Sequence, residues 1–413
     1  MPLVDNSREP QVVRERFHAV VIAALICLML PVVVLLVVDH AADAERFWVS
    51  GWLAGGFFIA LGVAKLYWGP YRALGLAPLG SLVELAAVGH GVYWQEWPGW
   101  VHGAAVGLMV GGLVRGRRWR ESKLQTIVLL AAVGVGVGVA YFLRQQERPL
   151  ERGEWFVLVA AGVVTVAAWV GFFRPVFELV LEPVVWILYR VRWSGPGFVD
   201  FPRTGPCLVI ANHACWLDPI FLAKVLPRPI TPMMTARFYD LPLLRWLMVA
   251  FGVIRVPEKT FKKDAPEIHE AVAALDRGEC LVIFPEGYLR RTESRPLRRF
   301  GQGVWQILKA RPQTPVYAVW IDGGWGSFTS YYNGPPTKNK RLDLRRPIRV
   351  GMSAPVRIPA DVLENHWATR TFLMNLVGEA RRHFGLEPLP TFTLPPVTDD
   401  NENSEDVEDT PRA

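Results

Sequence analysis

The sequence predicts a chain in two parts: an N-terminal all-α transmembrane bundle, followed by an α/β domain with a mixed, mostly parallel sheet flanked by helices. Two observations support this. Of the 413 residues, 51% are hydrophobic, and long uncharged apolar runs recur before residue 174. After residue 194, short buried-strand patterns alternate with helical segments and turn residues. The expected parts are a cytoplasmic segment 1–16, a membrane bundle 17–173, an interfacial helix 174–194, the α/β domain 195–393 and an acidic, disordered tail 394–413.

The first part contains apolar segments long enough to form membrane helices. Residues 17–38 carry no charged side chain, and about 20 apolar residues span the ~30 Å hydrocarbon core of a bilayer. The third such segment contains Glu84 and His90, and the fourth is short and contains His102, so four or five spans are the alternative to six. The six predicted spans are 17–38, 47–66, 75–94, 99–114, 125–143 and 155–173.

The distribution of lysine and arginine predicts the orientation of this bundle. With the N-terminus inside, the inner segments hold ten of these residues and the outer loops hold four. Cytoplasmic loops of membrane proteins are enriched in them. We therefore expect an integral, multi-pass protein of the cytoplasmic (inner) membrane, with both termini and the α/β domain on the cytoplasmic side.

Residues 174–194 differ from the preceding apolar segments. Their apolar side chains are interrupted by Pro183 and by the charged residues Glu178, Glu182, Arg190 and Arg192. Charges and a proline are unfavourable in a membrane span, whereas this composition is typical of a helix that lies in the membrane interface. A hydrophobic element buried against the following domain is the alternative.

A histidine and an aspartate stand at one predicted strand–loop–helix corner. Residues 207–211 are a short apolar run and predict a buried strand. Residues 219–226 can begin a helix with Asp218 as N-cap and Pro219 at the first position. The Asp218 carboxylate can then reach back to His213, and an aspartate that orients a histidine makes it a general base. Alternatively, Asp218 only caps the helix and His213 is an ordinary loop residue.

A second carboxylate is predicted at the end of a later strand. Residues 280–284 are another apolar run, and the turn Pro285-Glu286-Gly287 follows it. Because such sheets bind ligands at the carboxyl ends of their strands, we expect this turn and His213 at one edge. Two further strands and an intervening helix are expected at 251–256, 313–319 and 265–277.

Two other segments are candidates for positions near this edge. Residues 241–253 carry an apolar face with Trp246 and Met248, which we expect in the core, with an acyl-chain groove as the alternative. Residues 323–340 are rich in glycine and aromatic side chains and predict a loop that acts as a lid or as a second membrane contact.

In order and spacing, four blocks of this region resemble the phospholipid/glycerol acyltransferase family (1-acylglycerol-3-phosphate acyltransferase-like). The resemblance covers about residues 195–393, roughly half of the chain, and would make this segment a glycerolipid acyltransferase domain. Each block alone is a weak signal, and it is the ordered set that is specific. The blocks are His213-x4-Asp218, the Gly-x-Ile strand at 252–254, Phe-Pro-Glu-Gly at 284–287 and the Pro-Val strand at 315–316.

The resemblance implies a membrane-bound enzyme that transfers a fatty acyl group to a lysophospholipid hydroxyl. His213 would remove the proton of that hydroxyl, and Asp218 would orient the imidazole. The donor would be acyl-CoA or acyl-carrier protein as a co-substrate, with no cofactor and no metal. Glu286 and Gly287 would bind the acceptor or fix the loop. Cys215 raises the alternative of a cysteine acyl-enzyme, although we expect it to pack under the loop.

Two departures from the family pattern concern the acceptor's phosphate. Many family members have an Asp-Arg pair after the second block and Thr-Arg-Ser after the third. Here Pro257-Glu258 and Tyr288-Leu289-Arg290-Arg291 stand at these places. Lysophosphatidate is the expected acceptor, followed by another lysophospholipid. The candidate phosphate-binding cations are therefore Arg255, Lys259, Arg290 and Arg291.

The charge balance indicates anionic partners. The chain carries a net charge of +7, and the tail 394–413 carries −6, which leaves +13 on the rest. A basic surface suits a lipid bilayer and phosphorylated substrates. The six spans, and a sequence without an aromatic–basic recognition module, argue against nucleic acid. The four cysteines show no disulfide or metal-binding spacing, as expected in a reducing compartment.

Two other classes of function stay open. An intramembrane carboxylate such as Glu84 is a functional hypothesis by default. The first alternative is therefore a membrane lipid transporter or flippase-like protein with an accessory or degenerate acyltransferase domain. The second is a scaffold or lipid-binding protein, which predicts no turnover. The intact set of His213, Asp218 and Glu286 favours the enzyme.

Overall fold

The structure is a computed structural model that describes residues 173–258, 265–338, 340–342 and 344–393, with isolated positions between 75 and 170. The chain divides into two compact units, Met1–Val185 and Trp186–Ala413. Most of the predicted membrane bundle, residues 1–16 and the tail 394–413 lie outside the described residues, so they stay predictions. In the described part of the chain, no helix is both long enough and apolar enough to cross a membrane.

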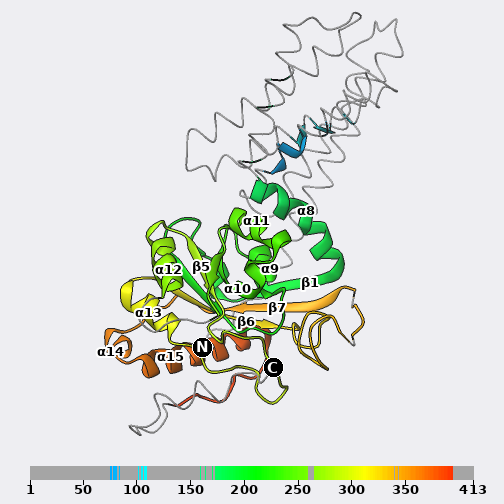
Figure 1. Cartoon of the computed structure of the whole chain (residues 1–413). Coiled ribbons are helices and arrows are strands. Elements are labelled where there is room, and N and C mark those ends of the chain that lie inside the picture. Colours follow the sequence, from blue (N-terminus) through cyan, green and yellow to red (C-terminus); the bar gives the residue numbers. More distant parts are fainter. Residues whose placement is uncertain are drawn as a thin grey trace, which may run out of the picture. The chain divides into compact units, whose positions relative to one another are not determined.

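One seven-stranded sheet forms the framework of the second unit (Figure 1). Its strands are β1 (Tyr189–Ser194), β2 (Cys207–Ala211), β3 (Thr231–Thr235), β4 (Ile254–Val256), β5 (Cys280–Ile283), β6 (Val316–Asp322) and β7 (Arg346–Met352). They follow the order β1-β7-β6-β2-β5-β3-β4, and neighbours are parallel except for the antiparallel pair β6–β7. This confirms the mixed, mostly parallel sheet that the sequence predicts.

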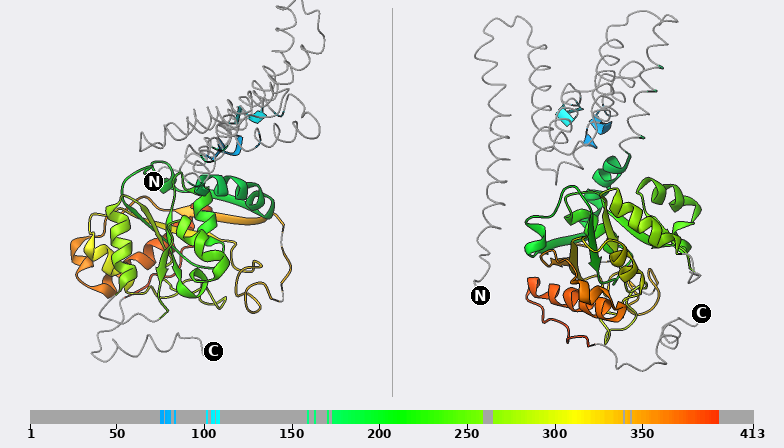
Figure 2. Two further views of the ribbon diagram at one scale, coloured as in Figure 1. Left: turned by 45° about the horizontal axis from the view of Figure 1, so that its top comes forward. Right: turned by 90° about the vertical axis from the view of Figure 1, so that its left-hand side faces the viewer.

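Helices cover both faces of this sheet, with α9 on one face and α15 on the other (Figures 1 and 2). Helices α12, α13 and α15 share an apolar core with β2 and β5. The helices are α8 (Phe173–Leu188), η2 (Pro196–Phe198), α9 (Asp218–Val225), α10 (Ala236–Tyr239), α11 (Pro242–Ala250), α12 (Pro266–Asp276), α13 (Gly303–Ala310), α14 (Ala360–Leu363), α15 (His366–Glu379) and η3 (Ala380–Phe384).

The central strands β2 and β5 are apolar throughout because helices cover both of their faces. All nine of their residues are at most 8% exposed, as expected for buried parallel strands. Their register pairs Cys207 with Cys280 and Ile210 with Ile283. The two strands therefore end at the same edge of the sheet, which brings the turns that follow them together.

The segment 174–194, predicted as one interfacial helix, consists of two elements, and that prediction was wrong in its second part. Helix α8 ends at Leu188, and β1 begins at Tyr189 and pairs with β7. Along β1, Arg190 and Arg192 are exposed, whereas Tyr189, Val191 and Trp193 are more buried. This period of two is that of a strand with one covered face. The α/β domain thus starts at β1 rather than at residue 195, and the interfacial role of α8 stays a prediction.

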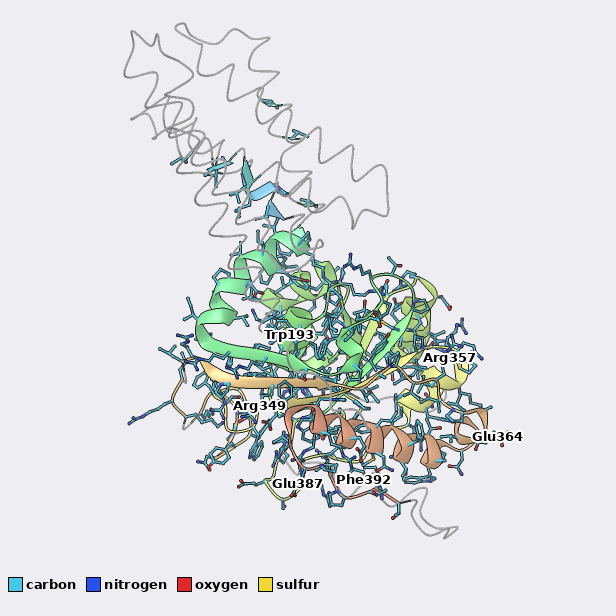
Figure 3. The ribbon with its side chains drawn as sticks, turned by 180° about the vertical axis from the view of Figure 1, so that it is seen from behind. Trp193, Arg349, Arg357, Glu364, Glu387 and Phe392 are labelled. Carbon is cyan, nitrogen blue, oxygen red and sulfur yellow. The ribbon has the colours of Figure 1, made fainter. Side chains whose placement is uncertain are left out.

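Two further boundaries differ from expectation. The strand predicted at 251–256 starts only at Ile254, because Phe251 closes α11 and Gly252 follows with φ 64°. Trp246 of α11, expected in the core, is 56% exposed. In the view from behind (Figure 3), Glu364 after α14 and Arg349 of β7 are well separated across the domain.

Candidate active site

The carboxylate of Asp218 organises the turn after β2. It is fully buried, and its Oδ2 accepts hydrogen bonds from the backbone N–H groups of Ala214 (2.7 Å) and Cys215 (2.9 Å). The same oxygen lies 2.9 Å from Nδ1 of His213. Leu217, not Asp218, occupies the N-cap of α9, and that cap makes no side-chain hydrogen bond. The predicted capping role was therefore wrong, because the carboxylate points back over its own turn.

The imidazole of His213 is held on two sides. Besides the contact of its Nδ1 with Asp218, its ring stacks on Phe284 with centroids 4.3 Å apart. The side chain is 20% exposed. Because an ionised carboxylate only accepts hydrogen bonds, Nδ1 carries the proton and Nε2 is left as the basic nitrogen. This arrangement is that of a general base with an orienting carboxylate.

Glu286 joins the turn after β5 to the turn after β2. Its Oε1 accepts from the backbone N–H of His213 (2.7 Å) and its Oε2 from that of Arg298 (2.8 Å). Burial raises the pKa of Glu286 to about 8, and the two N–H donors oppose this rise only in part. Both oxygens are occupied by the backbone, so this side chain positions the loop that carries His213.

Gly287 completes the tight turn at the end of β5. Its φ is 72°, in the left-handed region, and its N–H donates to the carbonyl of Phe284 (3.0 Å). Other residues are strained in that region, so the turn requires glycine. Added side-chain volume is not the constraint, because a Cβ at this position meets no atom within 4 Å.

Cys215 lies beneath the site and not in it. The residue is fully buried, and its Sγ donates to Oδ1 of Asp218 (3.2 Å). Burial, together with the neighbouring Asp218 carboxylate, raises the pKa of the thiol well above its usual value. The nucleophilic species is the thiolate, so this environment disfavours the acyl-enzyme alternative. The expected packing under a loop agrees with the β-bridge between Cys215 and Ser330.

Arg290 and Arg291 link the turn after β5 to the loop 323–340. The backbone N–H of Arg290 donates to the carbonyl of His213 (2.8 Å), and its Nε and Nη2 donate to the carbonyls of Thr292 and Glu293. Its guanidinium stacks over Trp325, and that of Arg291 stacks over Tyr331 at 3.5 Å. Burial lowers the pKa of Arg290. Arg291 is the more exposed of the two and has no such carbonyl contacts among the described bonds.

Of the other two predicted phosphate-binding cations, only Arg255 lies in the described part of the chain. Arg255 is on the edge strand β4 and binds the Asp240 carboxylate through Nε (2.9 Å) and Nη2 (2.5 Å). This partner raises the pKa of Arg255. Because β3 separates β4 from β5, Arg255 lies one strand further from the turn after β5, and its role in acceptor binding stays a prediction. Lys259 lies outside the described residues.

Comparison with known proteins identifies the domain that carries these turns. Residues 197–322 match the family model described as Acyltransferase. This segment is an acyltransferase domain. It contains β2 to β6 and with them His213, Asp218 and Glu286, and the protein is an acyl-transferring enzyme.

Two further comparisons add little to this match. A solved structure similar to the chain is the crystal structure of the 1-acyl-sn-glycerophosphate (LPA) acyltransferase PlsC from Thermotoga maritima. The sequences are 16% identical, the TM-score is 0.37, and the match covers 64% of this chain and 97% of that chain. Among curated proteins, none matched.

The acyltransferase domain contains two contributors to the site that the sequence did not reveal. The side chain of Asn212 donates to the carbonyl of Ile321 (3.0 Å) and accepts from its N–H (2.7 Å). This pair fixes the end of β2 to the end of β6. Gly324 packs so closely that a Cβ there would lie 3.2 Å from Oδ1 of Asp218. An amide directly after a buried strand was the available signal for Asn212, whereas nothing local marks Gly324.

The acidic and histidine side chains of the domain form no evident metal site. Among the residues that the structure describes, no group of three or more His, Cys, Asp or Glu side chains could hold a metal ion. The two turns bring together an imidazole–carboxylate pair and the backbone groups around it.

Proposed function

We propose that the protein transfers a fatty acyl group from an acyl thioester to the hydroxyl of a lysophospholipid, with lysophosphatidate as the first candidate. The observation that carries this proposal is the 2.9 Å contact between His213 Nδ1 and Asp218 Oδ2 inside an acyltransferase domain. Acyl transfer to a hydroxyl needs a base for the hydroxyl proton, and this pair supplies one.

The proposed reaction is a direct attack on the thioester. Nε2 of His213 takes the hydroxyl proton as the acceptor oxygen forms a bond to the thioester carbonyl carbon. When the tetrahedral intermediate collapses, the C–S bond breaks and the imidazolium returns the proton to the departing thiolate. The products are the acylated lipid and a free thiol. The buried Asp218 stabilises the imidazolium between these steps.

The proposed donor is acyl-CoA or acyl-carrier protein, without a bound cofactor or metal. For an acceptor with a phosphomonoester, Arg291 is now the best candidate to bind the phosphate. Its guanidinium carbon lies 3.5 Å from the centre of the Tyr331 ring, and no hydrogen bond to a carbonyl is described for its N–H groups, which can therefore bind an anion. Arg290 has fewer donors to offer, because two of its nitrogens bind carbonyl groups.

We further propose that the protein is an integral membrane protein with both termini in the cytoplasm. The support is the sequence of residues 17–173, with its apolar segments and its excess of basic residues on one side. A cysteine at Ser404 in the tail should react with an impermeant maleimide only after the membrane is opened. Labelling in intact cells would require an odd number of spans.

Turnover by the purified full-length protein tests the proposed activity. Labelled acyl-CoA and acyl-carrier protein are each offered with a panel of lysophospholipids, and the His213→Ala variant serves as the inactive control. Acylation of a lysolipid by the wild type alone supports the proposal. Turnover that His213→Ala retains in full would rule out His213 as the base, whereas no acylation by the wild type would favour the transporter alternative, whose candidate residue Glu84 lies outside the described residues, or the lipid-binding alternative.

A further inference from the structure

Helix α11 is apolar on the side that the domain leaves uncovered. Five residues of this helix, Pro242, Arg245, Trp246, Val249 and Ala250, are exposed, and we call them the α11 face. Trp246 is 56% exposed and Val249 is 62% exposed. These five positions follow the spacing of three, four and seven residues that places side chains on one side of a helix.

The opposite side of α11 is apolar as well. Leu244, Leu247 and Met248 are partly buried and turn toward the domain. A surface helix of a water-soluble domain normally presents polar side chains to solvent, whereas a helix that is apolar all round is covered on all sides. All residues of the α11 face except Arg245 are apolar, and the only polar group among these four side chains is the indole N–H of Trp246. This face is therefore suited to an apolar environment.

The charges around the α11 face have an excess of one sign. Residues 236–256 contain three arginines and one aspartate. The aspartate, Asp240, is bound by Arg255 through two hydrogen bonds. This leaves a positive excess made by two exposed residues, Arg237 on α10 and Arg245, which directly precedes Trp246 on α11. A tryptophan flanked by arginines is typical of segments at the boundary between acyl chains and anionic headgroups.

The α11 face is also connected to the catalytic turn. Phe238 of α10 contacts Trp216, edge to face, with ring centroids 5.6 Å apart. Trp216 lies within the turn between His213 and Asp218 and is itself 40% exposed. Aromatic packing thus links α10, the helix directly before α11, to the turn that carries the imidazole.

We propose that the α11 face is a docking surface for an anionic lipid bilayer, and that it places the catalytic turn at the membrane surface. Nine helical residues extend about 14 Å, far less than the ~30 Å hydrocarbon core, so α11 lies along the interface and does not cross it. The inference rests on the proposed function in one respect: it makes the bilayer the place where the enzyme meets its acceptor.

The positive rim favours lipid over the other possible occupants. A second copy of the domain would bring Arg237 and Arg245 close to the same two residues of its partner, because a two-fold interface pairs identical surfaces. Anionic headgroups instead complement these charges while acyl chains cover Trp246 and Val249. Each basic residue near such a surface favours docking by about fivefold.

Fluorescence quenching by lipid tests the docking. In the full-length protein with Cys27→Ser, the fluorophore NBD is attached at Val249→Cys, and the protein is placed in phosphatidylcholine vesicles with or without phosphatidylglycerol. The three described cysteines are buried and form no disulfide. The matched control carries the fluorophore at Glu364→Cys, an exposed position after α14, far from α11 (Figure 1).

Lipids with a spin label on the acyl chain should quench the fluorophore at Val249→Cys and leave that at Glu364→Cys unchanged. Quenching should be stronger with phosphatidylglycerol, and Arg237→Gln with Arg245→Gln should remove that difference. Three outcomes would overturn the proposal: no quenching in either vesicle, equal quenching at both positions, or disulfide-linked dimers of Val249→Cys, which would mean that a second copy covers the face.

Measurement of turnover provides a second test that is independent of the quenching experiment. Trp246→Ser should lower turnover of a long-chain lysophospholipid in vesicles by about tenfold and leave turnover of a short-chain, monomeric acceptor unchanged. Equal losses on both acceptors would place Trp246 in the fold or the substrate pocket and contradict docking. If the wild type acylates no lysolipid, the proposed function fails, while the quenching result still decides whether α11 docks.

Discussion

The turns after β2 and β5 have similar hydrogen bonding but different roles. Each contains a buried carboxylate that accepts two backbone N–H groups, Asp218 in the first and Glu286 in the second. Asp218 also contacts the imidazole of His213, whereas both oxygens of Glu286 are occupied by the backbone. The first carboxylate therefore acts on a side chain that can carry a proton, and the second fixes the shape of the site.

The difference shows how one turn supports the other. The N–H of His213 donates to Glu286, and the carbonyl of His213 accepts from the N–H of Arg290. The backbone of the base is thus held by the β5 turn, whereas its side chain is held by Asp218 and by the ring of Phe284. Two carboxylates at one sheet edge need not be two catalytic groups, and their partners distinguish the roles.

Removal of the base should have the largest effect. We expect His213→Ala to lower kcat/KM by 10²–10⁴-fold, since this is the usual contribution of a general base. Cys215→Ala should retain activity within a few fold, because the buried thiol only donates to Asp218. Kinetics with labelled donor and circular dichroism check both variants. A large loss in Cys215→Ala with little loss in His213→Ala would indicate an acyl-enzyme, and would contradict the roles assigned to the two turns.

Substitution of Arg290 and of Arg291 in the β5 turn should affect turnover of the two acceptors differently. Arg291→Ala should lower turnover of lysophosphatidate by 10–100-fold, equivalent to the ~1.5–3 kcal/mol of a charged hydrogen bond, with a much smaller loss on a zwitterionic lysolipid. Arg290→Ala should affect both acceptors alike, because its guanidinium holds the turn. Arg255→Ala, bound to Asp240, is the matched control. Equal losses of turnover on both acceptors in Arg291→Ala would contradict lysophosphatidate as the first candidate acceptor.

Glu286 should make stability depend on pH. Its folded pKa of about 8 lies above the ordinary value of 4.5, so between these values the native state retains a proton that the unfolded chain releases. The contribution of the protonated Glu286 to the free energy of unfolding is fully present below about pH 4.5 and is lost as the pH rises through about 8. We expect the Tm of the wild type to fall by roughly 3 °C or more from pH 5 to 8.5, relative to Glu286→Gln. Parallel profiles for the two proteins would show that the carboxyl group is ionised throughout.

The smallest effect should come from the loop over Asp218. In Gly324→Ala, the new methyl group would lie 3.2 Å from Oδ1 of Asp218 and 3.3 Å from Sγ of Cys215. A shift of a few tenths of an ångström relieves such contacts, so we expect a few-fold lower kcat with an unchanged KM. Gly205→Ala, where φ is 83° and the space is open, shows the effect of backbone strain alone, because Gly324 is not among the glycines with a positive φ. A large loss in both variants would indicate a general effect on folding.

Much of the domain could be predicted because its central strands are continuous apolar runs. Residues 207–211 and 280–283 appear as strands at the positions that their composition indicates. The pairing of His213 with Asp218 was also predictable, because five residues across a tight turn bring the two side chains within reach. Local sequence was enough wherever both partners lay in one turn.

The remaining features depend on distant contacts. Glu286 bonds to His213, 73 residues away in the sequence, and no local pattern indicates which N–H groups it accepts. The alternation along β1 was visible, but the apolar residues before it suggested that the helix continued. Apolar periodicity also could not show that Trp246 is exposed, because hydrophobicity predicts that a side chain is covered and not what covers it.

The position of β1 at the edge of the sheet has a consequence for how the chain folds. Its partner β7 lies far along the chain: Tyr189 pairs with Arg346, 157 residues later. Pairing across such a separation is slow, because a long loop must close before any contact is gained. During synthesis from the N-terminus, β1 emerges before every other strand and joins the sheet only after β7. Until then its backbone N–H and C=O groups have no strand to pair with, and a chain that ends before residue 346 would keep this exposed edge as a site of aggregation.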